Sequence, residues 1–134
     1  MPGLEPYLML ANEHYARARQ AVRQNDFHLA RVSYLKCVES WKNVVKFDSG
    51  YANRLSEAKQ KYANFARTDP LYLKTLPLIK AEIQRHPGVL QTELYKLLPS
   101  VEKTDISYAL YFAEEHGEIV RTKKGRTYQL ALRA

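Results

Sequence analysis

Cysteine is almost absent from this chain of 134 residues, since Cys37 is the only one, and no disulfide can form within the chain. Uninterrupted apolar runs, such as residues 8–11, fall far below the roughly 20 residues that a membrane-spanning helix needs. No charged and then apolar leader with a cleavage site opens the chain, so no secretion signal is expected. These absences predict a cytoplasmic protein with no membrane partner.

Glycine is scarce too, and the five glycines lie at turn and cap positions rather than in a phosphate-binding loop. The four histidines are scattered, with no cysteine or acid near them at metal-ligand spacing. Cys37 is expected in the core rather than as a nucleophile. Glu114 and Glu115 are expected to be an exposed pair at a helix end rather than an acid/base couple. We therefore predict no enzyme, no metal site and no cofactor.

Basic charge is what the sequence has in excess: 21 Lys and Arg against 14 Asp and Glu give a net charge of +7. The apolar fraction of 46% is that of a globular domain and excludes a disordered chain. Residues 1–70 carry +4 of the surplus and residues 71–134 carry +3. Such a surplus favours a polyanionic partner, but only the positions of the charges can identify a binding surface.

Residues 1–69 are predicted to form a three-helix bundle, because apolar side chains recur three and four residues apart in three stretches. Asp26 is expected to cap the second helix. Residues 48–50 and 68–70 are expected to end the second and third helices, and such short connections imply antiparallel neighbours. The apolar stripes are Leu8, Ala11, Tyr15, Ala18 and Val22; Phe27, Ala30, Tyr34, Cys37, Val38, Trp41, Val44 and Val45; and Tyr51, Leu55, Ala58, Tyr62 and Phe65.

Residues 11–47 resemble a tetratricopeptide (TPR-like) helical hairpin, or the similar three-helix MIT domain that binds the tails of trafficking proteins. The resemblance lies in Ala18, in the turn Asn25-Asp26-Phe27 and in the small–aromatic–small series Ala30, Tyr34, Cys37. The Trp and Leu-Gly positions usual in the first helix of the repeat are missing, and no second repeat follows. A plain helical bundle with this spacing is the alternative. A single hairpin must pack on the third helix, on the second half or on another copy.

Residues 70–134 follow a different pattern. Residues 68–76 are expected to link the two halves of the chain. Pro77 favours a helix that starts near Thr75 or Leu76. A short extended segment is expected at residues 89–90, then helices over residues 92–98 and 102–116. Strands are expected over residues 119–123 and 126–132, around the turn Lys124-Gly125. The first of these helices is expected to face inward at Leu94, Leu97 and Leu98. The second is expected to face inward at Ile106, Ala109, Leu110 and Ala113, with Gly117 as its C-cap.

This order of elements, over residues 75–132, is similar to that of a winged helix-turn-helix domain. Residues 88–94 resemble the entry to its second helix, and residues 106–110 the start of its recognition helix. Residues 113–121 resemble the leucine-glutamate-glutamate-x-glycine-x-isoleucine-valine-arginine run that leads into the wing, with Ala113 and Glu118 as departures. The resemblance implies a mainly α fold with a small β-hairpin wing and a DNA-binding function in transcription regulation.

The resemblance places the helix over residues 102–116 in the major groove, which admits one helix. The buried positions of this helix leave five polar side chains on its accessible face, where they can bond to bases or phosphates. Tyr108 has an alternative role in an aromatic patch with Tyr111 and Phe112 against the first half, and Phe112 is assigned to that patch. The candidate DNA-binding residues of the helix are Lys103, Thr104, Ser107, Tyr108 and Tyr111.

The hairpin carries the densest basic charge in the second half. Arg121, Lys123, Lys124 and Arg126 lie within six residues, and no acid follows Glu118. Such a tip can grip phosphates or reach along a minor groove. The alternative is that these side chains keep an edge strand soluble. The basic residues of the first half are expected to be a solvated face.

The leading hypothesis is a sequence-specific or general DNA-binding protein, a transcriptional regulator, whose partner is double-stranded DNA. Its N-terminal helices would supply self-association or bind a protein partner. The alternative is a protein–protein interaction adaptor that uses the winged helix and the helical hairpin as docking surfaces without binding DNA. In that case Trp41, Tyr34 or Tyr111 would line an exposed groove.

Overall fold

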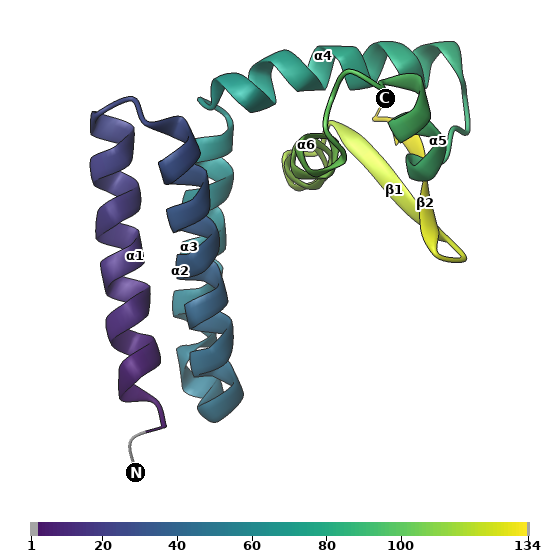
Figure 1. The fold of residues 1–134 in the computed structure, drawn as a ribbon. Helices are drawn as coiled ribbons and strands as arrows, with labels where there is room; N and C mark the ends of the chain where they lie inside the picture. The colour runs from purple at the N-terminus through teal and green to yellow at the C-terminus, as the bar shows by residue number, and fades with distance from the viewer. Residues whose placement is uncertain (1–2, 134) are drawn as a thin grey trace. The chain divides into compact units, whose positions relative to one another are not determined.

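The computed structural model describes residues 3–133, which are mainly helical and end in a two-stranded antiparallel hairpin (Figure 1). The chain divides into two compact units, residues 1–65 and 66–134. No helix in the described residues is long and apolar enough to cross a membrane. The elements are α1 (Glu5–Arg23), α2 (Phe27–Phe47), η1 (Ser49–Tyr51), α3 (Ala52–Ala66), α4 (Pro70–Arg85), α5 (Gln91–Leu97), α6 (Lys103–Glu115), β1 (Ile119–Lys124) and β2 (Thr127–Leu132).

The turn between α1 and α2 ends one helix and begins the next within three residues. Asn25 adopts a positive φ of 58°, a conformation that asparagine tolerates better than most residues. The Asp26 backbone N–H then donates to the Ala21 carbonyl at 2.8 Å, which closes α1. The Asp26 side chain accepts from the Leu29 N–H at 3.1 Å, so the predicted N-cap of α2 is confirmed.

In the first unit α1, α2 and α3 lie side by side around small and aromatic side chains (Figure 1). Cys37 is 2% exposed, which confirms its predicted place in the core. Tyr34 and Trp41 are also buried, so the prediction that Tyr34 lines an exposed groove is wrong, whereas Trp41 lines a small pocket between the helices. Their rings instead stack on Tyr62 and Tyr51, at centroid distances of 5.8 and 6.2 Å.

The helix α4 begins at Pro70, five residues before the predicted start, so the expected linker is helical over residues 70–76. The Asp69 side chain caps it by accepting from the Leu71 N–H at 3.0 Å, and Pro70 suits the first helical position. Pro77 lies inside α4 with its ring exposed. The helix continues through it because apolar side chains on both sides of Pro77, including Tyr72 and Ile79, are buried.

The predicted core of α6 is confirmed, because Ile106, Ala109, Leu110 and Ala113 are fully buried. In α5, by contrast, only part of the prediction holds: Leu94 is fully buried, whereas Leu97 is 36% exposed at the last position of this short helix.

Gly117 ends α6 as predicted, with a positive φ of 75°. The backbone N–H of Glu118 donates to the Ala113 carbonyl at 2.8 Å, which is the Schellman arrangement at a helix C-terminus. The chain therefore reverses directly after α6 and enters β1.

The hairpin turn lies one residue later than predicted. Lys124 pairs with Thr127, so the turn residues are Gly125 and Arg126. Gly125 has a φ of 60° at the first central position, where a type II′ turn requires a positive φ. On its other edge β2 receives the segment before α5, because the Leu130 N–H donates to the Val89 carbonyl at 2.9 Å. The extended segment expected at residues 89–90 is thereby confirmed.

Candidate nucleic-acid interface

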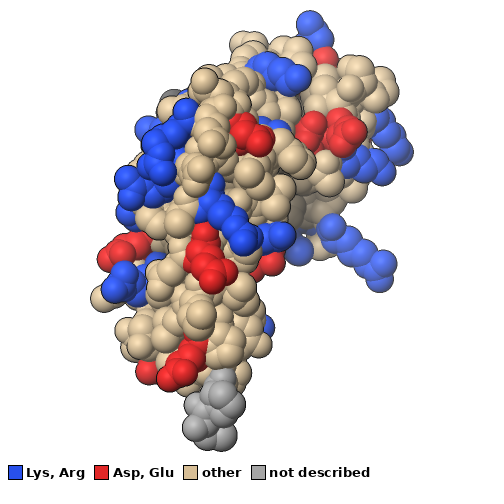
Figure 2. Space-filling view, turned by 60° about the vertical axis from the view of Figure 1, so that its left-hand side comes forward, with Lys and Arg blue, Asp and Glu red and all other residues tan. Residues whose placement is uncertain are grey.

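Basic and acidic side chains are interspersed over the face that Figure 2 presents. The densest cationic group in the second unit is the hairpin tip, where Lys123, Lys124 and Arg126 are all exposed. None of the three has an ion pair within the part of the chain that the structure describes. The Lys123 ammonium lies 5.2 Å from the centroid of the Tyr128 ring, which keeps it on one side of the hairpin.

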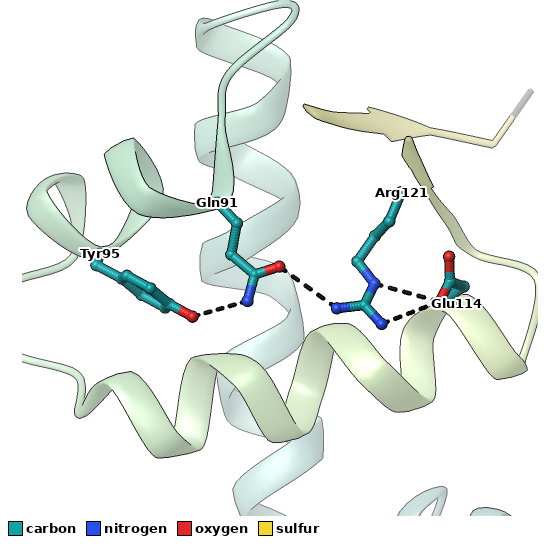
Figure 3. Close-up of polar contacts among 4 residues, drawn as sticks. All are labelled: Gln91, Tyr95, Glu114 and Arg121. Atoms are coloured by element: carbon teal, nitrogen blue, oxygen red, sulfur yellow. Dashed lines mark hydrogen bonds and ion pairs between the residues drawn. The ribbon is translucent and has the colours of Figure 1, made fainter. Parts of the chain in front are cut away.

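Arg121 differs from these three because its side chain is held inside the unit and is only 14% exposed. Its Nε and one terminal nitrogen donate to Glu114 Oε1 at 3.2 and 3.0 Å. The other terminal nitrogen donates to Gln91 Oε1 at 3.4 Å (Figure 3). The guanidinium also lies 4.5 Å from the Tyr128 ring centroid. With its donors so engaged, Arg121 ties β1 to α5 and α6, although it was predicted to contact DNA.

The contacts of Arg121 continue into a chain of polar side chains. Gln91 Nε2 donates to the Tyr95 hydroxyl at 2.7 Å (Figure 3). That hydroxyl lies 2.8 Å from Ser107 Oγ on α6, and the Lys103 ammonium lies 5.8 Å from the Tyr95 ring centroid. Ser107, a predicted DNA ligand, is therefore half-buried and hydrogen-bonded within the unit.

Sequence reasoning missed the roles of Gln91, Tyr95 and Glu114 in this chain of contacts. Glu114 was expected to be exposed, but it is half-buried against Arg121. The signal was present in the reversal at Gly117, because a strand that doubles back along α6 brings residue 121 next to residue 114. Opposite charges at the two positions are consistent with such a pair.

The aromatic residues of α6 also serve the fold. The Tyr108 hydroxyl donates to Asp69 Oδ2 at 2.7 Å, and Asp69 is fully buried. Phe112 is buried and meets the rings of Tyr108 and Tyr111 edge-on, at 5.2 and 4.9 Å. Tyr111 is 40% exposed, and burial, followed by the charge of Glu115, raises the pKa of its phenol. Its hydroxyl is thus a neutral donor near neutral pH.

Of the five α6 residues predicted to bind DNA, Lys103 and Thr104 in the first turn and Tyr111 further along the helix are exposed. Asp105 lies in the same first turn, and Glu114 and Glu115 lie at the other end of the helix. The negative charge of each of these side chains repels phosphate. The cationic surface of the second unit therefore consists of the hairpin tip and the start of α6.

A second polar cluster joins α4 to the entrance of β1. The Tyr72 hydroxyl donates to Glu118 Oε2 at 3.0 Å and lies 3.0 Å from His116 Nδ1. The Lys80 ammonium donates to Glu118 Oε1 at 3.0 Å. Partial burial alone would raise the pKa of Glu118, but these two hydrogen bonds and the charge of Lys80 outweigh it and lower the pKa.

Because the Glu118 pKa is lower in the folded state, the contacts of its carboxylate stabilise the second unit above the unfolded pKa, near 4.5, and are lost as the pH falls through the folded pKa. We expect the stability difference between the native chain and Glu118→Gln to be constant above about pH 5 and to shrink towards pH 3. The side chain is 38% exposed, so the effect should stay below about 1 kcal/mol. Amide hydrogen exchange in α6 measures it, and a difference that grows as the pH falls would contradict this prediction.

In residues 3–133 no three His, Cys, Asp or Glu side chains gather in a way that could hold a metal ion. The buried side-chain nitrogen and oxygen atoms of this part of the chain all have hydrogen-bond partners. No family model matches this chain, and neither a curated protein nor a solved structure is similar enough to it to count as a match.

Proposed function

We propose that residues 66–134 form a winged helix-turn-helix domain that binds double-stranded DNA as part of a transcriptional regulator. Support for the fold comes from the order α4, α5, α6 and hairpin, and from the bridge between Leu90 and Gln129 that adds a third extended segment beside β2. In this proposal α5 supports α6, the first turn of α6 enters the major groove, and the hairpin is the wing.

The observation that carries the proposal is the unpaired cationic hairpin tip. Lys123, Lys124 and Arg126 project from a tight turn, and residues 119–133 contain no acid. Phosphate oxygens are the ligands that such side chains prefer in DNA. Lys103 and Thr104 at the start of α6 are the nearest counterparts for base edges or further phosphates.

The salt dependence of binding to a mixed-sequence duplex tests this proposal. Four cations on the interface, Lys103 and the three of the tip, would release about four counterions. The slope of log K against log salt should then be roughly −3 to −4 between about 50 and 200 mM salt. Fluorescence anisotropy of a labelled duplex measures the affinity at each salt concentration. A slope near zero, or no binding at the lowest salt, would contradict the proposal.

A second candidate function is protein docking by the first unit. Large apolar side chains on α1 and α2 are individually exposed, and a protein partner or a second copy of the chain would remove them from water. These side chains are Met9, Leu10, Leu29, Leu35 and Phe47. If the duplex does not bind at low salt, docking becomes the better supported function.

A further inference from the structure

The first unit contains a cavity of about 110 Å³ where α1, α2 and α3 meet. The cavity is open to solvent on one side, where the lining residues Arg54, Glu57 and Lys61 are exposed. Its buried lining includes two small side chains, Cys37 and Ala58, from α2 and α3.

The floor of this cavity is apolar and neutral. Cys37, Trp41 and Ala58 line it and are each less than a tenth exposed. Burial raises the pKa of the Cys37 thiol, so sulfur carries no charge near neutral pH. The Tyr15 ring adds a further aromatic surface.

The rim of the cavity is cationic. Arg54, Glu57, Ala58 and Lys61 share one face of α3 because they are three and four residues apart. The Lys61 ammonium donates to the Tyr15 hydroxyl at 3.0 Å. The Arg54 guanidinium lies 6.0 Å from the centroid of the Trp41 ring.

Neither cation of the rim forms an ion pair in residues 3–133. Glu57 is the acidic residue that lines the cavity, so the lining carries a net charge of +1. An apolar floor below two cations without acidic partners suits a ligand with an apolar end and a single negative charge.

We propose that this cavity binds a short-chain aliphatic carboxylate, with the alkyl chain on Cys37, Trp41 and Ala58 and the carboxylate between Arg54 and Lys61. An apolar cavity of roughly 150 Å³ accommodates benzene in another protein. The smaller volume here fits an alkyl chain of about three carbons. This site is independent of the DNA-binding function proposed for the second unit.

The experiment uses the full chain and sodium butanoate as the probe. The chain has a single tryptophan, so one indole N–H cross-peak in a ¹⁵N–¹H NMR spectrum reports on the cavity. We expect this cross-peak to shift and saturate with a Kd on the order of 1 mM, since so small a ligand makes few contacts. Arg54→Gln/Lys61→Gln should weaken binding at least about tenfold, because both charged hydrogen-bond donors are lost.

Lys42→Gln/Lys46→Gln is the matched control, since it removes the same charge from exposed positions of α2 that do not line the cavity. This variant should bind butanoate as the native chain does. Butanamide, sodium chloride and sodium phosphate at equal concentrations should leave the indole cross-peak unshifted. A butanoate shift that does not saturate, that survives in Arg54→Gln/Lys61→Gln, or that butanamide or phosphate reproduces would overturn the proposal.

Discussion

Replacement of the three hairpin cations by alanine, in the variant K123A/K124A/R126A, is expected to lower the affinity for a DNA duplex about 100-fold at low salt. Each lost phosphate contact should cost about 1 kcal/mol, as for a well-formed exposed ion pair, and three such contacts give roughly this factor. The side chains are exposed and make no ion pair within the described residues, so the fold should remain intact. The slope of log K against log salt should fall by about three.

The control for this variant is K36A/K42A/K46A, which removes the same net charge from exposed positions on α2. Its affinity for the duplex should stay within about threefold of the native value, since only long-range electrostatics are altered. If both variants lose affinity equally, binding follows net charge and the hairpin is not the site. Anisotropy titrations of the native chain and the two variants under one buffer condition make the comparison.

The variant Asp69→Ala is expected to destabilise the second unit by about 3 kcal/mol. One carboxylate oxygen caps α4 through the Leu71 N–H, and a lost cap costs about 1 kcal/mol. The other oxygen accepts from the Tyr108 hydroxyl at 2.7 Å in a part-buried site, and loss of that acceptor costs about 2 kcal/mol. For a unit of this size the midpoint of thermal unfolding should fall by roughly 15 °C.

Two further variants separate the contributions of Asp69. Asp69→Asn keeps an acceptor oxygen for the cap and should lose less than half as much stability as Asp69→Ala. Tyr108→Phe removes only the hydroxyl and should cost about 1 kcal/mol. Hydrogen exchange of the buried amides in α6 follows the second unit specifically. Tryptophan fluorescence follows the first unit instead, because the single tryptophan, Trp41, lies there. If Asp69→Ala and the native chain have equal protection, the buried carboxylate does not support the junction of α4 and α6.

Local patterns in the sequence were sufficient to predict most of the elements. Apolar spacing predicts α1, α2, α3 and α6, and Asp26 and Gly117 act as the caps their residue types favour. The predicted start of α4 is wrong by five residues. The sequence shows the free-energy cost of Pro77 inside a helix, but it does not show that the side chains on both sides of Pro77 are buried. Burial across a whole helix outweighed one missing hydrogen bond.

The tertiary structure alone decided which charged residues are available to a partner. Lys123 and Arg121 are both basic residues of the same predicted strand. In the structure Lys123 is exposed to solvent, whereas Arg121 is bound by Glu114 and Gln91. The same holds for Tyr108, whose hydroxyl partner Asp69 lies 39 residues away in the chain. Such pairings depend on where the chain reverses and on which helices meet. A hydrogen bond forms between neighbours in space, whereas the spacing of apolar residues in the sequence shows only which residues are neighbours along one helix or strand.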